Sequence, residues 1–244
     1  MPHIKSNGST IHYLCEGSGR DIVVLPGLWT NSKWLAKYLD LKTHGKVWII
    51  DPPYSNLTHC RAGHSINYYA DKVIEAMKLL GITRPVIMAE SLGTTVALTI
   101  EKRTGAEKLV LVAPVINVER KLFLYTFTQM LTPTRSLVHQ RANMMFRRKP
   151  EMIPQAIEMM SGFGKSKLLG SIIAMKKYNA LNFKPSCPTL IIGGQYDKIS
   201  TPEKLDTVSQ AFGAKLVINK KTGHHVTEYA WPECFEQIVE FIEA

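Results

Sequence analysis

The stretch IMAESLGTTVAL (residues 87–98) is a mostly apolar run that the polar pair Glu90 and Ser91 interrupts. The residues up to 90 predict a buried strand and residues 91–105 predict a helix, so the chain turns sharply within one residue. A Ser at such a turn projects above the carboxyl edge of the sheet, where open α/β sheets bind their ligands. The alternative is an N-cap Ser that accepts a hydrogen bond from the helix backbone.

Small residues flank Ser91 at the positions where a strand-to-helix turn is most crowded. Ala89 lies two residues before it and Gly93 two residues after it. The resulting pattern, A-x-S-x-G, differs in its first residue from the G-x-S-x-G pattern of a nucleophile elbow. Because Ala still fits where the constraint is steric crowding, the pattern keeps Ser91 as a candidate nucleophile.

The remaining sequence alternates between short apolar segments and longer amphipathic ones. The apolar segments predict strands at 21–27, 46–51, 84–90, 107–114, 187–197 and 214–220, and the amphipathic segments predict helices at 65–81, 91–105, from about 201, and at 231–244. Alternating strands and helices indicate an α/β fold with a mostly parallel sheet and helices on both of its faces.

One segment departs from this alternation. Residues 115–184 are Met-rich, are cut by three prolines and contain no strong strand candidate. We therefore expect a core domain made of residues 1–114 and 185–244, with residues 115–184 inserted as a helical cap.

Composition and charge narrow the function classes. The 244-residue chain has a net charge of +10, of which the predicted cap contributes +9 through twelve basic and three acidic residues. No nucleic-acid-binding module accompanies this charge, so nucleic acid is not an expected partner. The chain shows neither a secretory leader nor an apolar run long enough to span a membrane, and its four cysteines are scattered; these features favour a cytoplasmic protein.

A Ser nucleophile needs a base and a carboxylate, and both follow later strands of the predicted sheet. Asp197 lies just beyond the strand at 187–197, and His224 and His225 lie in the loop after the strand at 214–220. Parallel strands bring these loops to the same edge, and the order Ser, Asp, His is the one this architecture uses. We prefer His224 over His225 as the base because of the family pattern described next.

The segments VVLPGLWTNSKWLAKYL, IIDPPYSNLT, YYADKVIEAMKLLGI, EKLVLVAPV, PTLIIGGQYDKISTPE and TGHHVTEYAWPE, taken in order, resemble the α/β-hydrolase superfamily. The resemblance covers nearly all of the chain except residues 115–184. It departs from the family pattern at Pro26, where a His commonly precedes the Gly, and in the loop after residue 51, where the usual glycines are replaced. In this family the catalytic His directly follows a Gly, as His224 does.

The resemblance implies a role for each candidate residue. Ser91 is the nucleophile, His224 the general base and Asp197 the carboxylate that orients it. The backbone amides of Leu28 and Leu92 form the oxyanion hole. Trp29 either lines the acyl pocket or is an ordinary packing aromatic. The alternative family position for the acid is unoccupied, and Glu119, the nearest carboxylate, is a poor substitute.

The predicted cap bears on the substrate. It contains seven of the ten methionines, namely Met130, Met144, Met145, Met152, Met159, Met160 and Met175. Such a basic, Met-rich segment is either a lid that steers anionic or lipid-like substrates to Ser91 or a solvated face over an ordinary helical core. The other histidines have no metal-ligand spacing, so no metal site and no cofactor are expected.

We therefore expect a serine hydrolase that cleaves a carboxylic ester or thioester, a small-molecule substrate, through an acyl-enzyme. The same three residues would also serve an acyltransferase or a perhydrolase, in which another nucleophile reaches the acyl-enzyme. A third interpretation is a non-catalytic receptor on the hydrolase scaffold. The sequence leaves the substrate, its chain length and the oligomeric state open.

Overall fold

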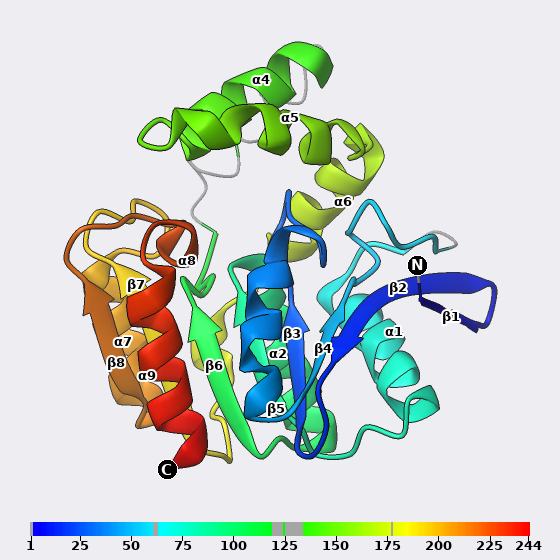
Figure 1. Cartoon of the computed structure of the whole chain (residues 1–244), viewed down its shortest axis with the longest axis vertical. Helices are drawn as coiled ribbons and strands as arrows, with labels where there is room; N and C mark the ends of the chain where they lie inside the picture. Colours follow the sequence, from blue (N-terminus) through cyan, green and yellow to red (C-terminus); the bar gives the residue numbers. More distant parts are fainter. Residues whose placement is uncertain (1, 61–62, 119–123, 125–133, 177) are drawn as a thin grey trace.

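The computed structural model describes residues 2–60, 63–118, 124, 134–176 and 178–244 (Figure 1). Its centre is an eight-stranded sheet with the order β1-β2-β4-β3-β5-β6-β7-β8. The strands are β1 (His3–Ser6), β2 (Ser9–Glu16), β3 (Asp21–Leu25), β4 (Lys46–Ile50), β5 (Val86–Glu90), β6 (Lys108–Val112), β7 (Thr189–Gly194) and β8 (Lys215–Asn219). β1 and β2 pair antiparallel, as do β2 and β4, and every other pairing is parallel.

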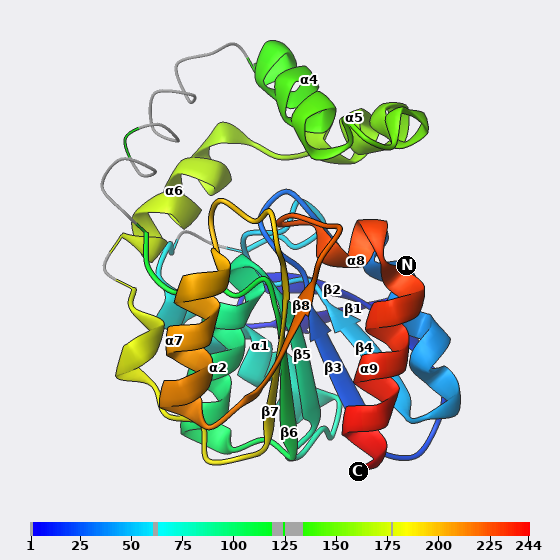
Figure 2. The same ribbon diagram turned by 90° about the vertical axis from the view of Figure 1, so that its left-hand side faces the viewer.

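Helices cover both faces of the sheet (Figure 2). One face carries α1 (Ile66–Leu79), α2 (Leu92–Thr104) and α7 (Pro202–Phe212), and the other carries the 3-10 helix η1 (Trp34–Thr43) and α9 (Trp231–Glu243). The central strands are buried continuously because side chains on both faces pack against helices. This architecture confirms the predicted α/β fold with a mostly parallel sheet.

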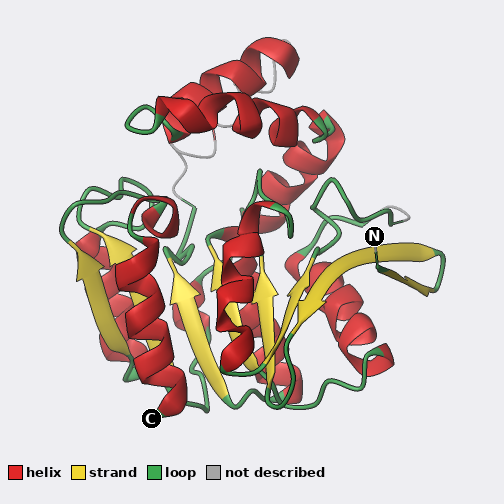
Figure 3. Ribbon diagram, viewed as in Figure 1, coloured by secondary structure: helices red, strands yellow, loops and turns green. Residues whose placement is uncertain are grey.

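A separate group of helices lies over the carboxyl edge of the sheet (Figures 1 and 3). It comprises α4 (Thr134–Met145), the 3-10 helix η2 (Pro150–Met152), α5 (Ile153–Ser161) and α6 (Lys165–Met175); the 3-10 helix η3 (Ala180–Asn182) leads back toward β7. These helices have a core of their own that includes Leu137, Phe146 and Met160. That residues 115–184 form a distinct cap remains a prediction, since 119–123, 125–133 and 177 lie outside the described residues.

Several elements were not predicted from the sequence. The hairpin of β1 and β2 extends the sheet at its antiparallel edge, η1 covers the sheet after β3, and a single turn, α8 (Val226–Tyr229), follows the two histidines. The predicted strands are one to five residues shorter than expected, because residues at their ends, such as Pro26, Gly27 and Pro114, belong to loops. None of the helices in the described ranges is long and apolar enough to cross a lipid bilayer.

Candidate active site

Ser91 occupies a strained turn between β5 and α2. Its backbone has φ 47° and ψ −117°, a conformation that is costly for a residue with a Cβ. Close packing enforces the turn, because a Cβ on Gly93 would lie 2.7 Å from the carbonyl oxygens of Leu25 and Pro26. Ser91 is the N-cap residue of α2, yet its side chain makes no capping hydrogen bond. The hydroxyl is therefore available to a partner outside the helix.

That partner is His224, and the predicted three residues form one line of hydrogen bonds. Ser91 Oγ lies 2.9 Å from His224 Nε2, and His224 Nδ1 lies 2.8 Å from Asp197 Oδ2. The three residues come from the loops after β5, β7 and β8, which end at the same edge of the sheet. The sequence prediction that these side chains converge agrees with this geometry.

The surroundings of Asp197 fix the tautomer of His224. Burial alone would raise the pKa of Asp197, but the hydrogen bond and charge of His224 and the amides of Ile199 and Ser200 lower that pKa below its ordinary value. An ionised carboxylate only accepts hydrogen bonds, so Nδ1 of His224 carries the proton. In the neutral ring Nε2 then carries no proton and can accept a hydrogen bond from the Ser91 hydroxyl.

His225 has different surroundings from His224. Its ring stacks on Phe146 with centroids 6.3 Å apart and meets His224 edge to face. Burial, followed by the neighbouring charge of His224, lowers the pKa of His225 to about 3. The neutral ring of His225 is thus a wall of the site, and His224 is the histidine that contacts Ser91.

The backbone amides predicted for the oxyanion hole belong to Leu92, which follows Ser91 in the chain, and to Leu28, which lines the same cavity as Ser91. Leu92 is the first residue of α2, so its N–H has no acceptor within the helix. The Leu28 N–H donates to no other group in the part of the chain that the structure describes. Tyr54 donates a 2.6 Å hydrogen bond to the Pro26 carbonyl and so holds the loop that carries Leu28. Their role as oxyanion donors stays a prediction.

A small cavity of about 40 Å³ opens beside Ser91. Its lining includes Leu28, Thr30, Glu90, Ala113, His225 and Thr227, together with Ser91 and His224. Trp29, Ser91 and Ala113, which follow β3, β5 and β6, all have positive φ angles. Such strained residues tend to collect at functional sites, where the surrounding structure holds them in place.

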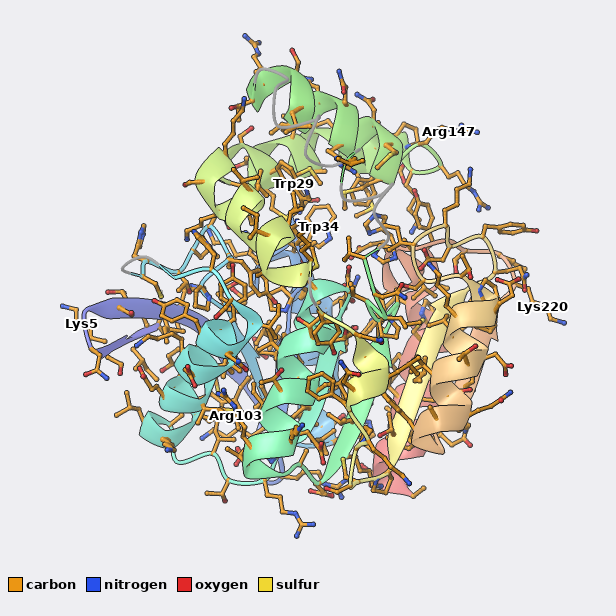
Figure 4. The ribbon with its side chains drawn as sticks, turned by 180° about the vertical axis from the view of Figure 1, so that it is seen from behind. Lys5, Trp29, Trp34, Arg103, Arg147 and Lys220 are labelled. Atoms are coloured by element: carbon orange, nitrogen blue, oxygen red, sulfur yellow. The ribbon has the colours of Figure 1, made fainter. Side chains whose placement is uncertain are left out.

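Trp29 is not among the residues that line this cavity. Its side chain is buried under the helices at the carboxyl edge, where its ring lies 5.8 Å from that of Phe163 (Figure 4). Of the two roles considered for Trp29, this position corresponds to that of a packing aromatic. Two of the methionines are packed in the same way, because Met145 and Met160 are buried in the core of the helical group. Met144, in contrast, is exposed.

The site contains a polar network to which the sequence analysis assigned no role. One oxygen of Glu90, Oε1, accepts hydrogen bonds from Tyr38 (2.8 Å) and Thr227 (2.7 Å). Next to it, Lys37 forms an ion pair with Glu228, to which Trp34 also donates. The only sequence signal for this network was the polar Glu90 within an apolar strand, because nothing in the pattern places η1 or α8 beside it.

Basic residues gather on the surface near the histidine loop. Arg148 donates to the Lys221 carbonyl and Lys149 to the Glu228 carbonyl, so the loop after α4 contacts the loop after β8. Arg147 and Lys220 are exposed and extend outward on the same side of the molecule (Figure 4). Several basic side chains thus lie on the surface near the histidine loop.

Other residues named from the sequence fall outside this site or outside the described residues. Glu119, the weak alternative to Asp197, and Met130 both lie in the segments that are not described. Within the described ranges, no group of three or more His, Cys, Asp or Glu side chains could hold a metal ion. His12 Nδ1 instead lies 2.8 Å from Asp51 Oδ2, in a buried hydrogen bond away from the site.

No family model matches the chain, and no curated protein matches it by sequence. Solved structures do resemble it. An esterase from Exiguobacterium antarcticum has a TM-score of 0.89 at 16% identity, covering 98% of this chain and 97% of that one. The enol-lactonase from Burkholderia xenovorans LB400 has a TM-score of 0.86 at 20% identity, with 100% of both chains covered. A bromoperoxidase from Bacillus anthracis has a TM-score of 0.88 at 16% identity, covering 97% of this chain and 96% of that one. Together with the sheet order and the strained Ser turn, these likenesses show that the chain has the fold of the α/β-hydrolase superfamily.

Proposed function

We propose that the protein is a serine hydrolase that cleaves a small carboxylic ester or thioester. The observation that carries this proposal is the continuous line of hydrogen bonds from Ser91 through His224 to Asp197. A Ser hydroxyl on a strained turn, aligned with an imidazole and a carboxylate, is the arrangement that nucleophilic catalysis needs, and it favours an enzyme over a receptor. Similar structures that include an esterase and an enol-lactonase also support a hydrolytic role.

The proposed reaction follows from the direction of each hydrogen bond. Ser91 Oγ attacks the substrate carbonyl carbon while His224 Nε2 takes the hydroxyl proton, and Asp197 stabilises the imidazolium that forms. The amides of Leu28 and Leu92 stabilise the oxyanion of the tetrahedral intermediate. His224 then protonates the leaving alcohol or thiol, and its Nε2 activates a water molecule that hydrolyses the acyl-enzyme.

The helical segment 115–184 would act as the lid of this site. Its loop after α4 contacts the histidine loop, and the stacked pair of Phe146 and His225 joins its core to the wall of the cavity. The basic residues outside the cavity would attract substrates whose leaving group is anionic. We also propose a cytoplasmic location, which the four unpaired cysteine thiols support.

A panel of aryl esters and acyl thioesters tests the proposed function. The wild-type protein should hydrolyse at least one class with saturation kinetics, and Ser91→Ala should remove that activity. Ser209→Ala is the matched control, because Ser209 is a nearly buried Ser on α7, remote from the site, that donates to the Asp206 carbonyl. Equal hydrolysis by wild type and Ser91→Ala would contradict the proposal.

A further inference from the structure

The cavity beside Ser91 is the space that the acyl group of a substrate would enter. Its lining joins Ser91 and His224 to the predicted oxyanion loop at Leu28, so a carbonyl carbon bound at Ser91 would point its substituent into it. One water-sized group needs roughly 10–15 Å³ of such space, so the cavity of about 40 Å³ holds about three non-hydrogen atoms. The volume of this cavity therefore suits a short acyl group.

Glu90 gives this cavity an unusual polar wall. Its Oε1 is occupied by the hydroxyls of Tyr38 and Thr227. Burial, and then the charge of Glu90, raise the pKa of Tyr38 well above its ordinary value, so the phenol keeps its proton and donates it. Two hydroxyls held from η1 and α8 thus fix the orientation of the carboxylate.

The second oxygen of Glu90, Oε2, is not part of these hydrogen bonds. No group in the described part of the chain donates to Oε2. Oε2 of Glu90 is not among the buried polar atoms that lack a hydrogen-bond partner in the described part of the chain. A carboxylate oxygen that is neither bonded nor fully buried, on a residue that lines the cavity, is available to accept a hydrogen bond from a group bound there.

We propose that the substrate has a short acyl group with a hydrogen-bond donor, an ammonium or a hydroxyl, on the carbon next to the carbonyl, and that Glu90 Oε2 binds this donor. The inference rests on the proposed function, because it needs an acyl group bound at Ser91. Neutral His225, Thr30 and Thr227 complete the wall, so Glu90 supplies the charge that selects among acyl groups. Glu90 would repel an acyl group that ends in a carboxylate. The basic residues outside the cavity would therefore attract a negative charge on the leaving group and not on the acyl group.

Three aryl esters with one leaving group and acyl groups of one shape test this proposal. They are the 2-aminopropanoyl, 2-hydroxypropanoyl and 2-methylpropanoyl esters, which differ only in an ammonium, a hydroxyl or a methyl on the same carbon. The variant is Glu90→Gln, whose amide oxygen stays with the two hydroxyls so that its NH₂ group faces the cavity. Glu101→Gln is the matched control, because Glu101 Oε1 also accepts two hydrogen bonds, from Ser186 N and Oγ, in a buried place on α2.

The readout is the ratio of kcat/KM for each donor-bearing ester to that for the methyl ester. Comparing this ratio between variant and wild type cancels the intrinsic reactivity of the esters. Glu90→Gln should lower the ratio for the ammonium ester at least tenfold, since a charge-assisted hydrogen bond becomes a repulsive contact. The ratio for the hydroxyl ester should fall less, because a hydroxyl can accept from the amide. Glu101→Gln should change neither ratio.

An unchanged ratio for the ammonium ester in folded Glu90→Gln would overturn the inference and leave the proposed function standing. A different result would contradict the proposed function itself: wild-type protein that hydrolyses neither the three esters nor any ester or thioester of the panel. A second measurement needs no variant and compares two inhibitors, 1-aminoethylboronic acid and isopropylboronic acid. In both, boron forms a bond with the Ser91 oxygen, and they differ only in an amino or a methyl group on the neighbouring carbon. The amino compound should inhibit wild type at least tenfold more tightly, and equal inhibition would also overturn the inference.

Discussion

Thr227 donates a 2.7 Å hydrogen bond to Glu90, which directly precedes Ser91 in the chain. Because Thr227 follows His224 by three residues, this bond ties the histidine loop to the strand that carries the nucleophile. Thr227→Val should therefore let His224 shift relative to Ser91 and lower kcat about tenfold to a hundredfold, with little change in KM. Steady-state kinetics on the best aryl ester measure this effect.

Two further variants separate positioning from general destabilisation. Thr227→Ser keeps the hydroxyl and should retain most of the activity. Thr99→Val is the matched control. It removes another buried hydroxyl, which donates to the Thr95 carbonyl within α2, and so deletes one hydrogen bond at a place away from the histidine loop. If Thr227→Val and Thr99→Val reduce kcat equally, the hydrogen bond to Glu90 has no positioning role.

The carboxylate of Asp197 should matter for both catalysis and stability. Asp197→Asn should lower kcat by about 10³-fold to 10⁴-fold, because the amide no longer favours the required tautomer of His224. The pKa of Asp197 is lower in the folded protein than in the unfolded chain. Ionised Asp197 therefore stabilises the fold fully at pH values above its pKa in the unfolded chain. This contribution is lost as the pH falls through its pKa in the folded protein. The difference in unfolding free energy between wild type and Asp197→Asn should thus shrink as the pH falls below about 4. A difference in urea unfolding that stays constant between pH 7 and pH 3 would contradict this.

His225 should destabilise the protein in acid. Its pKa is lowered to about 3 in the folded state, whereas an unfolded His titrates near 6.5. Between these values the unfolded chain binds one more proton, so the unfolding free energy should fall with decreasing pH by up to about 1.4 kcal/mol per unit. Urea unfolding of His225→Gln should show a flatter pH dependence than wild type. An equally steep dependence in both would show that His225 is not the group responsible.

The outer basic residues should affect catalysis only through long-range attraction. Esters with an anionic leaving group should lose kcat/KM steeply as salt rises from about 0.01 M to 1 M, while esters with a neutral leaving group should not. The double variant Arg147→Gln, Lys220→Gln should reduce that salt dependence. Equal salt dependence for both kinds of ester would remove the steering role.

The sequence predicted the features that depend on local pattern. Buried runs such as 21–25 and 86–90 identify strands because parallel strands are apolar on both faces, and the turn at Ser91 is visible in the small residues around it. Placing Asp197 and His224 with Ser91 needed only the rule that loops after parallel strands share one edge of the sheet. That part of the site follows from topology.

The remaining features depend on contacts between distant segments. Nothing near Glu90 in the sequence shows that Tyr38 and Thr227 converge on one of its oxygens, because η1 has no clear apolar periodicity and α8 is a single turn. Trp29 was ambiguous for the same reason, since only packing against Phe163 tells a buried aromatic from one that contacts a substrate. The hairpin of β1 and β2 pairs at the edge of the sheet, where one face is less constrained and the apolar pattern is weak.

The most direct test of the account is covalent labelling with a fluorophosphonate, in which an activated Ser oxygen attacks phosphorus and fluoride leaves. The account predicts one label per chain, on the peptide that contains Ser91, with no label in Ser91→Ala and a rate greatly reduced in His224→Gln but less so in His225→Gln. Labelling of the same extent in wild type and Ser91→Ala would contradict it.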